Sequence, residues 1–89
     1  MHTVTLNWVA SPDTVDGYNI YRGTAVGQET TKLNTAVVIG TTYVDTAPVV
    51  GHSYYVVKAS LGGVESVASN EVTVSLQPAA PTNLVATVA

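Results

Sequence analysis

Residues 2–9, HTVTLNWV, decide the fold of this chain, because apolar and polar side chains alternate along them one by one. Val4, Leu6 and Trp8 fall on one face of an extended segment, and the polar residues between them fall on the other. This period of two predicts a β-strand with one buried face. The cluster ASPDTVDG at 10–17 is rich in turn-forming residues and is expected to end the strand.

The rest of the body continues as short strands separated by turns. Val and Thr dominate, which favours β structure, and no window has the spacing of an amphipathic helix. The further strands are expected at 18–22, 31–34, 41–46, 53–60 and 70–76. Strands at roughly 8–12-residue spacing predict an all-β sandwich of two antiparallel sheets, immunoglobulin-like in architecture. The expected core is Val4, Leu6, Trp8, Tyr18, Ile20, Leu33, Tyr43, Tyr55, Val57, Ala59, Val72 and Val74.

Composition excludes several classes of function. The 89 residues suit one domain, and the net charge of -3 rests on only three positive side chains, so no basic surface for nucleic acid is expected. Hydrophobic residues make up 46% of the chain, but no apolar run approaches the ~20 residues of a membrane helix. The first residues do not read as a signal peptide. Without cysteine there is no disulfide, thiolate metal site or thiol nucleophile.

The remaining polar residues do not form a catalytic or metal-binding pattern. His2 and His52 are far apart in sequence and lack zinc-ligand spacing. Asp13 and Asp16 flank one turn, where backbone capping is the simplest role and a weak cation contact is the alternative. We therefore predict no enzyme activity, no cofactor and no metal. Tyr21 and the region of Tyr54 offer aromatic rings on an outer face, so a weak protein or glycan contact is an alternative function.

Four pieces of the sequence resemble a fibronectin type III domain of the kind repeated in bacterial secreted proteins. They are VTLNW at 4–8, GYNIYRG at 17–23, TTYVDT at 41–46 followed by GHSYY, and SNEVTV at 69–74. The resemblance implies a β-sandwich with 2–9 and 41–46 in one sheet, an empty edge beside 2–9, and the other four strands in the second sheet. It also implies a non-catalytic spacer or assembly role in an extracellular or secreted parent protein. The spacing leaves open whether Tyr54 or Tyr55 is the tyrosine at the family's corner. The family's first strand, which should precede residue 2, is missing.

A segment that resembles this missing strand lies at the other end of the chain. We divide the chain into a domain at 1–76, a Pro/Ala linker at 77–81 and a first-strand-like segment at 82–89. In the last segment Leu84, Ala86 and Val88 share one face. We expect this face to pair beside Val4, Leu6 and Trp8 of a neighbouring copy, as donated strand and acceptor strand of a head-to-tail polymer. The alternatives are a reciprocal exchange between two copies, a monomeric circular permutant that serves as a scaffold, and a ligand- or carbohydrate-binding accessory module of a secreted enzyme.

Overall fold

A computed structural model describes residues 2–89 of the protein. These residues form seven strands and no helix, and the last thirteen residues lie outside any strand. The strands are β1 (Val4–Asn7), β2 (Gly17–Gly23), β3 (Thr31–Lys32), β4 (Thr42–Asp45), β5 (Gly51–Leu61), β6 (Val64–Glu65) and β7 (Val72–Leu76). The all-β composition predicted from the sequence is therefore confirmed.

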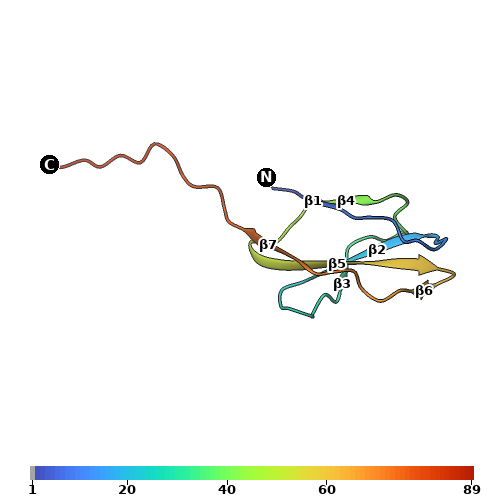
Figure 1. Ribbon diagram of the computed structural model, residues 1–89. Coiled ribbons are helices and arrows are strands. Elements are labelled where there is room, and N and C mark those ends of the chain that lie inside the picture. The colour runs from blue at the N-terminus through green and yellow to red at the C-terminus, as the bar shows by residue number, and fades with distance from the viewer. Residues whose placement is uncertain (1) are drawn as a thin grey trace.

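The strands form two antiparallel sheets that lie in two layers (Figure 1). One sheet contains only β1 and β4, and in the other β5 is central, with β2 on one side and β6 and β7 on the other. This division of strands is the one predicted from the sequence, and the layered arrangement is sandwich-like. It leaves β1 with a strand partner on one edge only among the described residues.

The two layers meet in a small core built from alternate residues of β1, β2 and β5. Leu6, Ile20 and Tyr55 are buried at its centre. Half-buried side chains pack around them: Val4, Trp8, Leu33, Val38, Tyr43, Val57 and Val74. Most of the predicted core is thus confirmed, and Tyr55 rather than Tyr54 is the tyrosine that points inward.

Two expectations about burial were wrong, one in β7 and one in β5. Val72 was predicted to be buried but is 44% exposed, because it borders a side of the sandwich on which nothing covers it in the described chain. Val56 was not in the predicted core but is only 6% exposed. It points to the outer face of β5, where neighbouring strands on both sides shield it.

The strand predicted at 70–76 begins two residues later than expected, because the chain before it leaves the β-ladder. Ser60 pairs with Glu65 and Tyr55 pairs with Val72, so four residues of β5 face the six residues 66–71. This bulge is held by two serines. Ser66 donates its N–H to Ala59 O and accepts from Ala59 N through its hydroxyl, and Ser69 makes the same pair of contacts with Val57. β6 and β7 are therefore two pieces of one interrupted edge.

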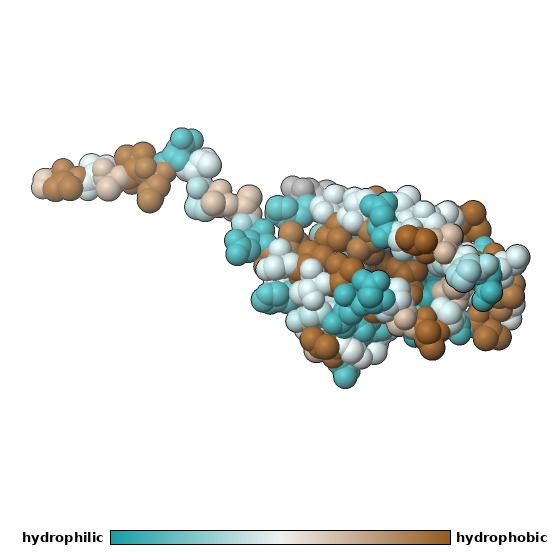
Figure 2. Space-filling model, in the orientation of Figure 1, coloured by the Kyte–Doolittle hydropathy of each residue, from teal (hydrophilic) through white to brown (hydrophobic). Residues whose placement is uncertain are grey.

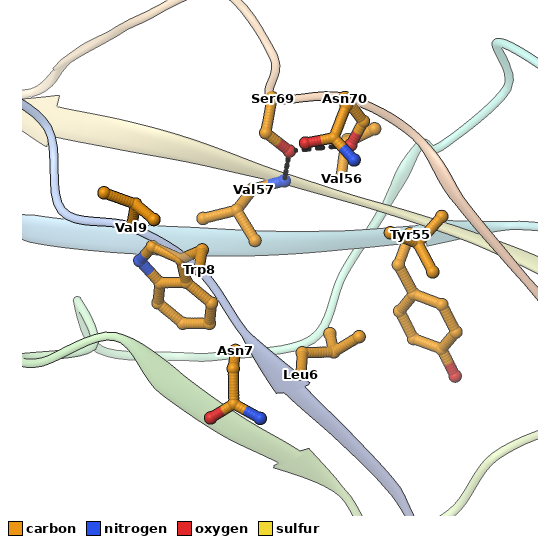
Figure 3. Close-up of a pocket in the computed structure, with 10 residues that line it drawn as sticks. Leu6, Asn7, Trp8, Val9, Tyr55, Val56, Val57, Ser69 and Asn70 are labelled. Atoms are coloured by element: carbon orange, nitrogen blue, oxygen red, sulfur yellow. Dashed lines mark hydrogen bonds between the residues drawn. The ribbon is translucent and has the colours of Figure 1, made fainter.

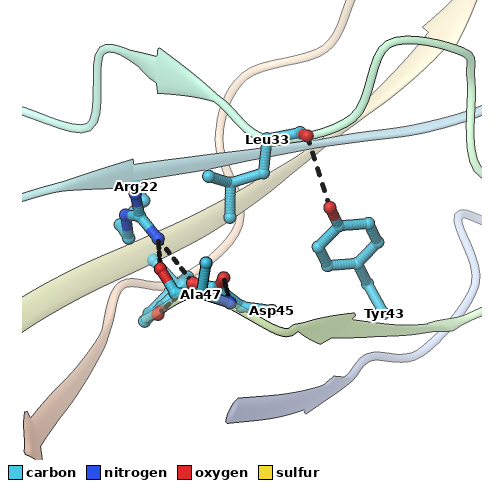
Figure 4. Close-up of polar contacts among 6 residues, drawn as sticks. Arg22, Leu33, Tyr43, Asp45 and Ala47 are labelled. Carbon is cyan, nitrogen blue, oxygen red and sulfur yellow. Dashed lines mark hydrogen bonds and ion pairs between the residues drawn. The ribbon is translucent and has the colours of Figure 1, made fainter. Parts of the chain in front are cut away.

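One side of the sandwich, which we call the closed side, is tied across the two layers by polar contacts (Figure 4). Arg22 of β2 contacts Asp45 of β4 at 2.6 Å, and the buried Tyr55 hydroxyl donates to the same carboxylate at 2.8 Å. Near the other end of β4, the Tyr43 hydroxyl donates to Leu33 O at 3.3 Å. These contacts hold the β4 edge of the small sheet against the large sheet.

The tail at 77–89 leaves the body at the end of β7 and extends away from it (Figure 1). All of its residues are exposed. Asn83 has φ 59, a left-handed conformation that asparagine tolerates better than most residues, and it bends the tail just before Leu84. The tail exits beside Gly51, where β5 begins, an end that we call the linker pole. The opposite end, with the turn after β1 and the Gly62–Gly63 hairpin, is the loop pole.

Candidate functional site: the open side of the sandwich

The side of the sandwich opposite the closed side has no strand over it in the described chain. Here β1 forms one wall, and β5 with the bulge at 66–71 forms the other (Figure 3). The space between them is a hollow of about 360 Å³ whose lining includes Leu6, Trp8, Val57 and Val72. In Figure 2 an apolar band follows the body between its two layers. We call the space between the two walls, together with the side chains that line it, the groove.

A second hollow of about 180 Å³ continues the groove towards the loop pole. Trp8, Val9, Val57 and Ser69 line both hollows, so the two adjoin. Trp8 stands between them with its ring edge against Tyr18, at a centroid distance of 5.4 Å. Of the predicted acceptor residues, Leu6 and Trp8 line the groove, whereas Val4, on the same face of β1, packs against the core cluster.

The free edge of β1 offers backbone groups as well as side chains. Trp8 donates its N–H to Thr41 O, on the β4 side of the strand. In an antiparallel ladder the residues that bond to one neighbour alternate with those that bond to the other. The peptide groups of Thr5, Asn7 and Val9 consequently face the open edge, where another strand would find both donors and acceptors.

Trp8 carries a second sign that the groove is incomplete. Its indole Nε1 is buried and has no hydrogen-bond partner among residues 2–89. A buried donor without a partner costs roughly 1–3 kcal/mol, and an incoming backbone carbonyl would satisfy it. Trp8 is also the only tryptophan of the chain, so its fluorescence reports on the groove alone.

The predicted donor residues lie apart from this groove in the single chain. Leu84 is 98% exposed and Val88 is 94% exposed, and Ala86 between them is exposed as well. Large apolar side chains that share one face of an extended segment and touch nothing are unusual on a soluble surface. The structure therefore brings the acceptor residues together and leaves the donor residues in the tail.

The sequence predicted only some of the residues that line the wall opposite β1. The sequence placed Val57 and Val72 inward, but it gave no indication that Val67 and Ser69 would border the middle of the groove. The available signal was the loss of alternation in VASN at 67–70, which marks a departure from a regular strand. Ser69 is visible in Figure 3, where its hydroxyl accepts from Val57 N at 2.9 Å.

Asp13 and Asp16 take part in hydrogen bonds within the chain, whereas His2 and His52 are exposed. Asp16 accepts a hydrogen bond from Gly62 N at 2.8 Å and so links the two loops of the loop pole, and Asp13 donates its N–H to the Ser11 hydroxyl. Among residues 2–89, no three His, Asp or Glu side chains gather in a way that would hold a metal ion. Nor do these residues include a helix long and apolar enough to cross a membrane.

The outer tyrosines differ from each other. The Tyr21 hydroxyl donates to Glu65 at 2.6 Å, and Asn19 donates to the same oxygen at 2.8 Å. This hydrogen bond raises the pKa of Tyr21 and lowers the pKa of Glu65. The Lys58 ammonium lies 4.8 Å from the centre of the Tyr21 ring, so the ring face and the hydroxyl are both engaged within the chain. Tyr54 is half-buried.

Comparison of the chain with protein-family models, with curated proteins and with solved structures gave no match in any of the three. The functional assignment therefore depends on the geometry of the groove and the tail.

Proposed function

We propose that this domain is a non-catalytic structural module that self-associates head to tail, each copy donating residues 82–89 to the groove of the next. One observation carries the proposal. The described chain has an apolar groove beside an unpaired strand edge, and it also has an unpaired segment whose alternate side chains are apolar and fully exposed. The segment could cover the groove, and the groove could bury the apolar side chains of the segment.

The register of the donated segment follows from the two alternations. In an antiparallel pair, residues directly opposite each other point to the same face. With Leu84 opposite Trp8, Ala86 falls opposite Leu6 and Val88 opposite Val4. All three donor side chains then enter the groove, while Val85 and Thr87 place their peptide groups against those of β1 and their side chains outward.

Insertion of the tail into its own groove is disfavoured by distance. Leu76 pairs with Gly51 at the linker pole. Leu84, opposite Trp8, would occupy the second hollow, which is lined by Val57 and Ala59. These two residues are six and eight residues beyond Gly51 along β5. That separation is roughly 20–26 Å. Eight steps from Leu76 to Leu84 span at most ~28 Å, and the path must also pass round the edge of the sheet. Donation to another copy needs no such return.

The strand pairing also supports the resemblance to fibronectin type III domains. We propose that β1 corresponds to the second strand of that fold and that the donated segment completes it as the first. A heterologous contact of this kind extends into a chain of copies unless its geometry closes.

The proposal is tested by sedimentation velocity across a concentration series, with Trp8 fluorescence followed in parallel. We expect assemblies of increasing size as the protein concentration rises. The Trp8 emission should shift to shorter wavelength at the same time, because the donated segment excludes water from the groove. Leu84→Asp should weaken association by about 100-fold, since it loses apolar burial and places a charge in the groove. Val85→Asp, one residue away on the outward face, is the matched control and should associate normally.

A folded monomer at all concentrations would contradict the proposal. Growth that stops at two copies would replace head-to-tail donation by reciprocal exchange.

A further inference from the structure

The groove continues beyond the end of β1. A third hollow of about 380 Å³ lies at the loop pole, between the turn at 11–15 and the hairpin at 61–66. Ser11, Ala59 and Ser66 line both this hollow and the middle one, so the three hollows form one continuous path along the open side. The segment 82–89, in the register given above, fills only the first two.

The third hollow is mostly apolar and lies beyond the end of β1. Leu61 is 53% exposed and Val64 is 73% exposed, and with Val15 they form its apolar lining. Its other wall is a turn, not the edge of β1, so an occupant cannot continue the pairing with β1 there. The hollow therefore suits a short apolar segment that does not need backbone pairing.

The residues that precede the donated segment have this chemistry. Pro78, Ala79, Ala80 and Pro81 are apolar, and the two prolines have no N–H to satisfy. Such a segment favours the extended polyproline conformation, which advances about 3.1 Å per residue. Ala80 lies four residues before Leu84, so it would reach about 12 Å beyond the middle hollow. Asn83, whose φ of 59 bends the tail, stands where the chain would leave the line of β1.

We infer that the segment recognised by each copy is residues 78–88 of its neighbour, with the Pro/Ala linker seated in the hollow at the loop pole. The inference rests on the proposed strand donation and extends it to the linker. Because prolines already restrict the free linker, its docking loses less conformational entropy than that of a flexible segment.

Docking of the linker fixes the spacing of the copies. Only two residue steps separate Leu76, the end of the donor's last strand, from Pro78 on the acceptor, a reach of at most ~7 Å. The linker pole of one copy would then abut the loop pole of the next. The assembly would be a stiff rod rather than a string of domains on flexible connections.

Cross-linking between single-cysteine variants tests the inference directly, since the chain has no cysteine of its own. Two variants are mixed at a concentration that supports assembly, treated with a short thiol-specific cross-linker, and the linked heterodimers are identified by mass. We expect Ala80→Cys to link with Val64→Cys at the loop pole, and Val88→Cys to link with Val72→Cys. The crossed pairs, Ala80→Cys with Val72→Cys and Val88→Cys with Val64→Cys, serve as controls and should give no product.

The outcomes separate the inference from the proposed function. If Val88→Cys links with Val72→Cys but Ala80→Cys does not link with Val64→Cys, strand donation stands and linker docking is wrong. If the crossed pairs form instead, the donated segment runs in the opposite direction, which overturns the inference. If no pair forms, the proposed function itself fails. Val64→Asp should weaken association by about tenfold, whereas Val44→Asp, on the outer face of β4, should not.

Discussion

The two long sides of this sandwich differ in how the edges of the two sheets are connected. On the closed side, Arg22, Asp45 and Tyr55 connect the two sheets, and Asn34 covers the outer edge of β2 by accepting from Ile20 N at 2.9 Å. On the open side, no hydrogen bond joins β1 to the wall at 66–72 among the described residues. Trp8 Nε1 remains without a partner there.

The two sides differ in how far a single chain covers them. The closed side is covered within one chain, because the Asp45 carboxylate accepts from Arg22 and Tyr55 across the two sheets and Asn34 bonds to the edge of β2. The open side exposes apolar side chains and strand-edge peptide groups that have no cover within the described chain. Mutations on the closed side should therefore change the stability of each copy, and mutations on the open side should change association.

The largest effect is expected from Asp45→Ala. Asp45 is 5% exposed and accepts from the Tyr55 hydroxyl, Arg22 and Ala47 N. Removing one partner of a buried ion pair typically costs roughly 3–5 kcal/mol, a large part of a domain's total of about 5–15 kcal/mol. Urea denaturation should show a greatly lowered midpoint or an unfolded chain. Asp45→Asn keeps the shape of the side chain and should lose less stability. Equal losses of stability in the two variants would mean that the charge of Asp45 alone matters.

The next effect concerns the open side. Deleting residues 80–89 should lower the melting temperature at assembling concentrations, because the groove loses its occupant and burial of Leu84 alone is worth roughly 1.5–3 kcal/mol. At dilution below assembly, the full chain and the truncated chain should melt alike. If the two chains melt at the same temperature at every concentration, the tail makes no contribution and the open side is stable as it stands.

The contrast between the sides also explains which features the sequence predicted. Alternation in β1, β2 and β5 was sufficient to place Leu6, Ile20 and Tyr55 in the core, whereas the division of the strands into two sheets followed from the resemblance to fibronectin type III domains. Alternation could not predict the bulge at 66–71, because there serine hydroxyls replace backbone carbonyls as acceptors and the pairing depends on β5. Nor could it predict that Asn19 is 4% exposed, since Asn34, fifteen residues away, supplies its partner.

The buried tyrosine of the closed side makes the stability of the fold depend on alkaline pH. Burial first, and then the hydrogen bond to Asp45 and its charge, raise the pKa of Tyr55 from 10.0 to about 12. The neutral hydroxyl is therefore favoured in the folded state, so its contribution to stability is complete below pH 10.0 and is lost as the pH rises through about 12. Denaturation at pH 9 to about 12 should show a steeper loss for the natural chain than for Tyr55→Phe. Parallel curves would contradict the assignment.

At acidic pH the free energy of unfolding changes with pH in the opposite direction. Burial raises the pKa of Asp45, but hydrogen bonds from Tyr55, Ala47 N–H and Arg22 outweigh it and leave that pKa below its ordinary value of 3.8. The charged carboxylate stabilises the fold above pH 3.8, and this contribution is lost as the pH falls through the lowered value. The unfolding free energy of Asp45→Asn should change less than that of the natural chain between pH 4 and about 2.

The smallest effect should come from Ser69→Ala in the bulge. Its hydroxyl accepts from Val57 N at 2.9 Å, an exposed hydrogen bond that water can replace, so the loss of stability should be only about 0.5–1 kcal/mol. The local effect should be larger than the global one, because Val57 N–H loses its only intramolecular acceptor on that wall and its hydrogen exchange should accelerate. Ser75→Ala, at an exposed position in β7, is the control and should leave the exchange of Val57 unchanged. Addition of assembling concentrations of protein should restore protection in Ser69→Ala if the donated segment packs against this wall. Exchange that stays fast on assembly would place the donated strand away from the bulge.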